Sequence, residues 1–467
     1  RDLDAATRYV PPVVTPTRAG GFDQKIAIIG AGPAGLSCAF YLAEKGYKPV
    51  VFEKNERPGG MLTYGIPSFK LQKDVIEAEV EIIRLMGAEF RYGVEVGRDV
   101  TLDELREQGF KAFYVAIGCQ GGRLAGIPGE DAEDVTVAVD FLREVNSGKI
   151  DALPGRTIVV GGGNVAIDVA RNACRLGSEH VEMFCLESEA QMPASEEERR
   201  EAIEDGAHIS CGWGPKEVHL DETGRVCGIT FKRCTRVFDD EGRFAPEYDE
   251  NDLRRVDADR VVMSIGQSIV WGDLLAGSKV ELGRGQGALA DPQTYQTAEP
   301  DIFVGGDVYT GPSFAIDAIA AGHEAAVSIH RFVQPGSTLT IGRNQRRYTA
   351  LDRDDVVIES YDNANREVAH VDREREKAAP FSEYVETFTE EQVRAETARC
   401  LGCGASIVDP NKCIGCGLCT TKCAFDAIHL DRDRPECSTM VKYEQKLPSL
   451  GLSLIHISEP TRLGMIS

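Results

Sequence analysis

The chain lacks the features that mark membrane and secreted proteins. Its 467 residues contain no stretch of 18 or more consecutive apolar residues, and no signal peptide opens it. We therefore expect a soluble protein without membrane insertion. The first residue is Arg1 rather than Met, so we also expect that an N-terminal portion is missing.

Positive charge is scarce. The 52 Lys and Arg residues face 75 Asp and Glu residues, which gives a net charge of −23. A protein that binds nucleic acid needs a basic surface for the phosphates, so no nucleic acid partner is expected. Solubility is a sufficient explanation for an acidic balance of this size.

Closely spaced cysteines are missing from the first 399 residues. No C-x-x-C or C-x4-C pair occurs before Cys400, and single cysteines suit a reducing compartment, so we predict a cytoplasmic location. The other seven of the 14 cysteines crowd between Cys400 and Cys437, which indicates metal or cluster ligation rather than disulfides. The seven single cysteines are Cys38, Cys119, Cys174, Cys185, Cys211, Cys227 and Cys234.

The N-terminal part of the chain has the pattern of a dinucleotide-binding βαβ unit. An apolar strand leads into Gly30-x-Gly32-x-x-Gly35, a helix follows, and the next strand ends on Glu53. Gly30 permits a tight turn, Gly32 lets the backbone approach a pyrophosphate, and Gly35 lets helix and strand pack closely. The helix N-terminus favours the anion, and Glu53 is placed to accept hydrogen bonds from ribose hydroxyls.

The same plan occurs a second time. Its strand ends on Glu187 with no arginine at Cys185 or Leu186, which favours a free ribose 2′-hydroxyl. We therefore predict NADH rather than NADPH, while Arg199 and Arg200 further along keep NADPH open. The second turn, in which Ala is an accepted variant of the last glycine, consists of Gly161, Gly163, Asn164, Val165 and Ala166.

Several stretches accompany the two turns. In each copy a further buried strand ends in glycine, at Gly118 and at Gly266. The loop around Gly60 and Met61 is glycine-rich, and we favour a loop that lies close to a flat ring over a plain surface loop. Thr101 and Glu104 predict a helix start with a capping box.

The first domain is expected to resume near Asp291. A strand there ends on Gly306 and Asp307, for which a plain helix cap is the alternative interpretation. A helix with small residues on one face is predicted over 311–322, and Ser313 and Ala315 lie at its start.

The most specific motif is a run of cysteines with the spacing of a ferredoxin. Thiolates three residues apart bind one cubane cluster, and in two-cluster ferredoxins the fourth reaches a neighbouring cluster. Zinc would normally show two separated pairs. Two 4Fe–4S clusters need eight thiolates and this region has seven, so one or two clusters remain possible. The candidate ligands are Cys400, Cys403, Cys413, Cys416, Cys419, Cys423 and Cys437, of which Cys413, Cys416 and Cys419 are assigned to one cluster.

These patterns predict an α/β protein with two Rossmann-like nucleotide-binding domains, the second inserted into the first, and a ferredoxin-like module. The end of the chain, from residue 452, looks like translated sequencing adapter and is excluded. The predicted segments are an arm (1–22), the split first domain (23–120 and 266–335), the second domain (121–265), a connecting arm (336–395), the cluster module (396–447) and a non-native tail (448–467).

Together, the motifs resemble the two-dinucleotide-binding flavoproteins, and among them the small (β) subunit of glutamate synthase and its relatives. The resemblance covers about residues 23–335 and is carried by both turns, Gly59 to Pro67, Met192-Pro193 and Gly305 to Asp307. It implies FAD on the first domain, with its ribityl chain on Asp307, and a nicotinamide cofactor on the second. The predicted cofactor-binding residues are Gly30, Gly32, Pro33, Ala34, Gly35, Glu53, Gly60, Met61, Gly118, Gly161, Gly163, Asn164, Val165, Ala166, Glu187, Gly266, Gly306, Asp307, Ser313 and Ala315.

The predicted function is an NAD(P)H-dependent oxidoreductase subunit. Hydride passes from NADH to FAD, and single electrons pass through the cluster to an electron-transfer protein or a larger oxidoreductase subunit. Because the cofactors carry this chemistry, no side chain is assigned as a catalytic acid or base.

Three alternatives were weighed against this function. The main one is the glutamate synthase small subunit itself, which supplies electrons to a large amidotransferase subunit. In that family the cluster domain commonly precedes the FAD unit, and NADPH-binding members carry an arginine pair where this chain has Leu186-Glu187. A scaffold without catalysis would leave the cluster ligands idle. A disulfide reductase would need a close cysteine pair before Cys400.

Overall fold

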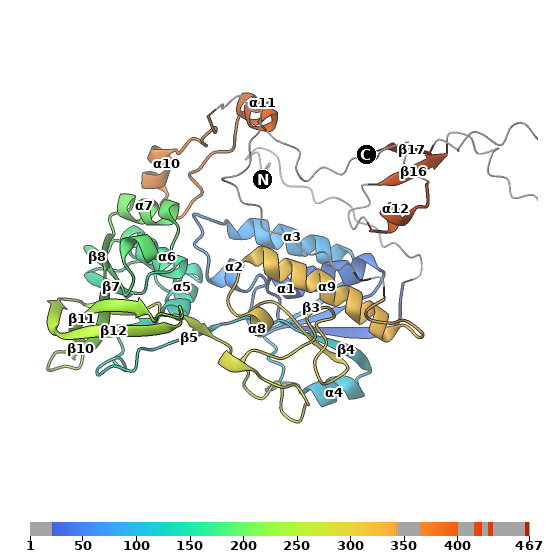
Figure 1. The fold of residues 1–467 in the computed structure, drawn as a ribbon, viewed down its shortest axis with the longest axis horizontal. Helices are drawn as coiled ribbons and strands as arrows, with labels where there is room; N and C mark the ends of the chain where they lie inside the picture. Colours follow the sequence, from blue (N-terminus) through green and yellow to red (C-terminus); the bar gives the residue numbers. More distant parts are fainter. Residues whose placement is uncertain are drawn as a thin grey trace, which may run out of the picture. The chain divides into compact units, whose positions relative to one another are not determined.

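The computed structural model describes residues 21–341, 343, 365–399, 415–422, 428–432 and 463–466 (Figure 1). The chain divides into two compact units, one made of residues 1–355 and 369–387 and the other of 356–368 and 388–467. In the described ranges, every helix is too short or too polar to span a bilayer.

The first sheet is parallel and buried on both faces. Ile26 and Ile28 of its central strand face one core, while Ala27 and Ile29 face the other. This explains why the strand is a continuous apolar run rather than an alternating one. The strand order is β15 (Ile302–Val304), β4 (Phe110–Val115), β1 (Lys25–Ile29), β2 (Val50–Glu53) and β3 (Glu89–Tyr92).

Two helices lie alongside one another over the first sheet, α1 (Pro33–Glu44) and α9 (Ala315–Val333) (Figure 1). Ser37 Oγ donates to the Ile319 carbonyl at 2.6 Å. Gly322 permits this contact, because a Cβ there would lie 2.2 Å from the Ala34 carbonyl oxygen. The helix predicted over 311–322 corresponds to α9, which begins at Ala315 and extends to Val333. Its small residues pack against α1.

Four further helices belong to the first domain: α2 (Met61–Tyr64), α3 (Lys73–Leu85), α4 (Leu102–Glu107) and α8 (Asp307–Thr310). The predicted capping box is confirmed at α4, where Thr101 accepts from the Glu104 N–H and Glu104 accepts from the Thr101 N–H. A single turn of 3-10 helix lies at Arg284–Gln286.

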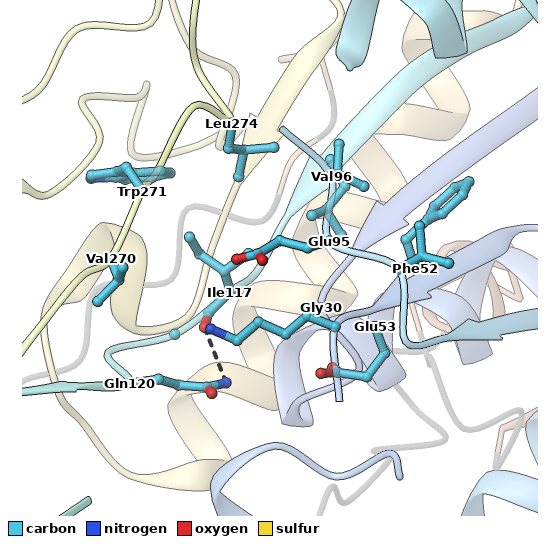
Figure 2. Close-up of a pocket in the computed structure, with 14 residues that line it drawn as sticks. Gly30, Phe52, Glu53, Glu95, Val96, Ile117, Gln120, Val270, Trp271 and Leu274 are labelled. Atoms are coloured by element: carbon cyan, nitrogen blue, oxygen red, sulfur yellow. Dashed lines mark hydrogen bonds between the residues drawn. The ribbon is translucent and has the colours of Figure 1, made fainter. Parts of the chain in front are cut away.

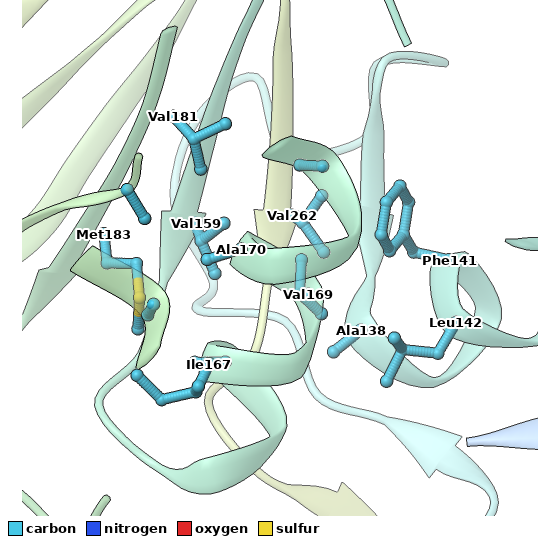
Figure 3. Close-up of a cluster of buried hydrophobic side chains, with 14 of the residues drawn as sticks. Ala138, Phe141, Leu142, Val159, Ile167, Val169, Ala170, Val181, Met183 and Val262 are labelled. Carbon is cyan, nitrogen blue, oxygen red and sulfur yellow. The ribbon is translucent and has the colours of Figure 1, made fainter. Parts of the chain in front are cut away.

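The second sheet repeats the plan of the first. Figure 3 shows its core, in which Val159 and Met183 of the strands meet Ile167 of α6 and Phe141 of α5. The parallel order is β6 (Val135–Val137), β13 (Arg260–Met263), β7 (Arg156–Val160), β8 (His180–Cys185) and β9 (His208–Cys211), with α5 (Ala138–Asn146), α6 (Asn164–Arg175), a 3-10 turn (Glu189–Gln191) and α7 (Glu196–Glu204).

The second sheet is inserted between strands β4 and β15 of the first, which confirms the predicted fold class. The chain enters the insertion through β5 (Gly121–Gly122) and leaves it through β14 (Gln267–Ser268). These two short strands pair antiparallel, Gly122 opposite Gln267. The two connections therefore lie side by side between the nucleotide-binding domains.

An antiparallel β-ribbon of three strands, which the sequence patterns did not predict, projects from the inserted domain. It consists of β10 (Trp213–Leu220), β11 (Val226–Phe238) and β12 (Phe244–Val256). Phe231 of the ribbon stacks on Phe184 of β8 with ring centroids 3.9 Å apart. The ribbon thus packs on the face of the second sheet opposite α5 and α6.

Part of the segment predicted as a connecting arm packs on the inserted domain. Arg171 of α6 is 1% exposed, donates to the Tyr384 hydroxyl at 2.6 Å and pairs with Asp205 at 2.7 Å. Arg175 pairs with Glu376 of α10 (Arg373–Ala378) at 2.6 Å. The contact thus combines ion pairs with the buried Tyr384 and with Phe381, which packs against the core of the inserted domain.

The second compact unit contains short elements in its described residues. These are α11 (Glu390–Ala398), α12 (Leu418–Lys422) and the antiparallel pair β16 (His429–Arg432) and β17 (Leu463–Ile466). Strand β17 falls in the tail that we predict to be non-native. Residues 1–20 of the predicted arm (1–22) lie outside the described residues.

The close contact of α1 and α9 predicts a matched pair of serine variants. Gly322→Ser places a Cβ against backbone and should destabilise the first domain by about 1–3 kcal/mol. Ala320→Ser introduces the same residue at an exposed position of the same helix and should change the thermal midpoint little. Thermal unfolding followed by circular dichroism measures both, and equal midpoints would contradict the proposed packing constraint.

Candidate functional site

The first glycine turn contains two glycines that the fold needs and one that it does not. Gly30 has φ +104°, and a Cβ there would lie 2.4 Å from the Ala116 carbonyl oxygen. A Cβ on Gly35 would lie 1.9 Å from the Gly30 carbonyl oxygen. Gly32 instead has φ −76° and ψ −179°, a conformation open to any residue, and a Cβ there would meet nothing within 4 Å. The turn thus keeps free space at Gly32, at the start of α1.

The acid at the end of β2 is fixed beside this turn. Glu53 is 3% exposed, and its Oε2 accepts from the Ala31 N–H at 2.8 Å. Its Oε1 accepts from the Asn55 N–H at 2.9 Å and from Asn55 Nδ2 at 2.7 Å. These hydrogen bonds hold the carboxylate beside the turn.

Glu53 also borders a small pocket of 40 Å³ between the ends of β1, β2 and β4 (Figure 2). Phe52, Val96 and Trp271 contribute apolar surface to its lining. Gln120 donates to the Ile117 carbonyl at 3.4 Å across the pocket. Lys54, Glu95 and Gln120 contribute polar surface, so the pocket next to Glu53 has both apolar and polar walls.

A larger cavity of 240 Å³ continues from the first turn. The loop after β2 closes against the turn, because Gly59 N–H donates to the Ala31 carbonyl at 2.8 Å. The cavity brings together predicted residues from four separate parts of the chain: Gly30, Gly32, Pro33, Ala34, Glu53, Gly60, Met61, Gly118, Gly306, Asp307, Ser313 and Ala315. Gly35 is not among its lining residues, since its role is helix packing.

Asp307 is more than a helix cap. The N-cap of α8 is Gly306, with no side-chain cap, and Asp307 is the first helical residue. Burial raises the pKa of its carboxyl, while backbone hydrogen bonds from Ser313 and Cys119 lower it. The carboxylate is thus held between the end of β4 and the approach to α9.

The second turn repeats the geometry of the first and opens into a cavity of 820 Å³. Gly161 has φ +140°, and a Cβ there would lie 2.2 Å from the Ser264 carbonyl oxygen. Gly163 is extended (φ −89°, ψ 173°), and a Cβ there would meet nothing within 4 Å. Glu187 Oε2 lies 3.0 Å from a Cβ placed on Gly162, the equivalent of Ala31. The predicted residues that line this cavity are Gly161, Gly163, Asn164, Val165, Glu187 and Gly266.

The two arginines that the sequence left open do not line this cavity. Arg199 donates to the Glu189 carbonyl at 2.7 Å, and Arg200 lies 3.8 Å from Glu204. Ala166 lies under the turn and packs in the core. The sequence analysis missed Gly162 and the wall contributed by the ribbon, notably Trp213, Lys232 and Tyr248, because that wall is distant in sequence from the turn.

An ion-pair cluster bridges the two domains beside the first cavity. Lys70 Nζ pairs with Asp168 Oδ1 of α6 at 2.6 Å and also with Glu198 of α7. Asp168 lines the cavity, and burial raises its pKa to about 6, although Lys70 opposes this. Nearby Lys73 donates to the Leu62 carbonyl at 2.9 Å, and burial lowers its pKa to about 8. No pattern in the sequence predicts this cluster, because its members come from α6, α7 and the region of Lys70 and Lys73.

Of the seven candidate cluster ligands, Cys416 and Cys419 lie in the described residues. Cys416 is exposed between Gly415 and Gly417, which have φ +64° and +75°, and Cys419 lies half-buried on α12. Outside the described residues lie Cys400, Cys403, Cys413, Cys423 and Cys437.

Comparison with known proteins identifies the family. Residues 24–322 match the family described as pyridine nucleotide-disulphide oxidoreductase. The chain belongs to this family. Residues 406–429 match the 4Fe-4S binding domain, which confirms the predicted ferredoxin-like module.

The disulfide named in the family description has no counterpart at the first cavity among the described residues. Cys185 and Cys211 do lie with their Sγ atoms 3.7 Å apart, at the ends of β8 and β9. Of the two, Cys185 lines the second cavity, and burial raises the pKa of its thiol. An un-ionised buried thiol is a poor nucleophile.

Two relatives confirm the resemblance seen in the motifs. The chain is 36% identical over 399 residues to the NADP(+)-dependent formate dehydrogenase subunit beta of Moorella thermoacetica, which covers 81% of this chain. It is 36% identical to the glutamate synthase [NADPH] small chain of Escherichia coli (strain K12), over 67% of this chain and 69% of that one. It spans only about half, 54%, of the formate dehydrogenase subunit.

A solved structure supports the fold of this family member. FprA from Mycobacterium tuberculosis aligns with a TM-score of 0.57 and 20% identity, over 66% of this chain and 84% of that one. At this identity the likeness concerns the fold alone.

The bridging cluster predicts a pH-dependent effect of Lys70→Met. The pKa of Asp168, about 6, is above the usual value near 3.9, so ionisation of Asp168 costs stability as pH rises through 4 to 6 and the full cost is present above 6. Removing Lys70 leaves that carboxylate unpaired and should cost about 3 kcal/mol at pH 8, and less at pH 5, where Asp168 is mostly protonated.

Thermal midpoints at the two pH values, measured as differences from the parent protein, test this. Lys70→Met in an Asp168→Asn background is the control, because it should show nearly the same loss at both pH values. A single variant equally destabilised at pH 5 and pH 8 would contradict the assigned role of Asp168.

Proposed function

We propose that the chain binds FAD at the first turn and NADH at the second, and transfers electrons from NADH to 4Fe–4S clusters and a protein partner. The observation that carries this proposal is the contact between the two cavities. Val165, Gln267 and Pro312 line both of them. A flavin ring and a nicotinamide ring that extend from their own turns would therefore meet at these residues.

Different residues of the first cavity suit different parts of FAD. The empty space at Gly32 admits a pyrophosphate against the start of α1, and Glu53 accepts from the adenosine ribose. Asp307 is placed for the hydroxyls of the ribityl chain. The loop with Gly60 and Met61 and the residues before α9 then lie against the flavin ring.

The protein's own contribution is placement and electrostatics. When bound, FAD supplies the conversion of a two-electron hydride into single-electron transfers. The N-terminus of α9 begins at Ala315 in the first cavity, and its dipole stabilises negative charge at the ring by roughly 0.3–1 kcal/mol. The bridge from Lys70 to Asp168 and Glu198 holds the inserted domain over the same cavity.

The domain limits given above are proposed with these roles: FAD binding for 23–120 and 266–335, and nucleotide binding for 121–265. Cys413, Cys416 and Cys419 are proposed to bind one cluster. The remaining thiolates, Cys400, Cys403, Cys423 and Cys437, leave the number of clusters at one or two.

The partner is proposed to be a larger oxidoreductase subunit or an electron-transfer protein. Both relatives described above are named as a subunit or a chain of a larger enzyme. The match to the formate dehydrogenase subunit extends over 81% of this chain, against 67% for the glutamate synthase small chain. This favours a partner other than a glutamate synthase large subunit. Copurification with such a large subunit would instead support the alternative function, that of a glutamate synthase small subunit.

Two equivalent glycine variants test the function. Gly32→Val and Gly163→Val each place a side chain in free space, so folding should be preserved while the respective pyrophosphate is excluded. Gly32→Val should lose most of the bound flavin. Gly163→Val should retain it, but anaerobic NADH should no longer bleach its absorbance.

The parent protein provides the reference for this experiment. Flavin content is read from the absorbance of the released cofactor, and bleaching is followed without oxygen. Failure of NADH to bleach the flavin of the parent protein would refute the proposed NADH-dependent oxidoreductase activity. Loss of flavin from both variants would refute the assignment of FAD to the first turn and NADH to the second.

The nucleotide preference is tested at Glu187. A carboxylate repels a 2′-phosphate and accepts from a 2′-hydroxyl, so Glu187→Arg should raise the Kd for NADH about tenfold and lower that for NADPH. Gln191→Arg, at an exposed position of the 3-10 turn that follows β8, is a control for added charge. An unchanged preference in Glu187→Arg would contradict the assignment of this strand end.

A further inference from the structure

The wall opposite the second turn comes from the β-ribbon. Trp213, Lys232 and Tyr248 line the cavity together with the glycine turn and Glu187. Among the described lining residues, Lys232 carries the positive charge and Glu187 the negative one. The cavity thus presents a cation and an anion on different elements.

The ribbon is joined directly to the strand end that carries Glu187. The Gly212 N–H donates to the Glu187 carbonyl at 3.0 Å. A Cβ placed on Gly214 would lie 2.5 Å from Tyr248 Cε1 and 2.9 Å from Leu186 Cδ2. The Tyr248 ring therefore packs beside the residue that precedes Glu187.

Lys232 is held on that ring. Its Nζ lies 4.1 Å from the centroid of Tyr248, and its side chain is 21% exposed. It pairs with Glu250 Oε1 at 2.8 Å, while Glu250 Oε2 lies 3.4 Å from Lys216. Glu250 is on β12 and is not among the lining residues of the cavity. It therefore partly neutralises the charge of Lys232 from a position outside the cavity.

We propose that Lys232 is a specificity-determining residue for the ribose 2′ position of the nicotinamide nucleotide, and that Glu250 moderates it. The inference rests on the proposed function, which places this nucleotide at the second turn. An ammonium group is a standard partner of phosphate, and Glu187 opposes the same phosphate. The preference for NADH is then a balance: Glu187 acts against NADPH, Lys232 acts for it, and Glu250 weakens the effect of Lys232.

Direct binding to the full chain, with its flavin reduced by dithionite beforehand under anaerobic conditions, tests this without hydride transfer. Isothermal titration with NADPH and NADH would compare the parent protein with Lys232→Met, Lys232→Arg and Glu250→Gln. Losing a hydrogen bond to a charged group should raise the NADPH Kd about tenfold in Lys232→Met, with a much smaller change for NADH. Glu250→Gln should lower the NADPH Kd, and Lys232→Arg should retain most of the parent affinity.

Arg236→Met is the matched control. Arg236 lies on the same strand, pairs with Glu247 and Asp240, and does not line the cavity. It should leave the ratio of the two Kd values unchanged. Normal NADH binding with an unchanged ratio in Lys232→Met would overturn this inference alone. Absence of any nucleotide binding to the parent protein would overturn the proposed function, and the inference with it.

Discussion

The structure depends on the close approach of helix α1 to the backbone around it. Gly35 brings the helix against the Gly30 carbonyl, and Gly322 brings α9 against the Ala34 carbonyl. These contacts leave no room for a side chain. They place the start of α1 over the end of β1 and bring the approach to α9 to the same cavity, so the packing of the domain and the geometry of its site have one cause.

The inserted domain has a glycine turn of the same geometry, but other elements surround it. In both turns the middle glycine is extended and faces free space, and an acid lies beside the residue before it, at the end of β2 in the first turn and two residues after β8 in the second. The first acid, Glu53, is buried under loops of its own domain, whereas Glu187 faces a wide cavity walled by the β-ribbon. The same turn geometry therefore occurs beside a buried acid in the first domain and beside a wide, open cavity in the inserted domain.

The relative position of the first domain and the inserted domain brings their two cavities together. Antiparallel pairing of β5 with β14 holds the two connections together, and Lys70 reaches from the first domain to Asp168 and Glu198 of the second. Both contacts lie next to the residues shared by the two cavities. The buried carboxylate of Asp168, with its raised pKa, shows that the bridge is kept in spite of a desolvation cost.

The sequence by itself determined the two turns, their acids, the insertion of one domain into the other and the cluster module. These depend on local spacing, since glycine positions and strand periods are set by backbone sterics over a few residues. Only the tertiary structure decided that Gly60, Gly118 and Asp307 border one cavity, that Lys70 bridges the domains, and that Lys232 and Glu187 line the same cavity. Such contacts join distant elements through charge and shape, and these leave no period in the sequence.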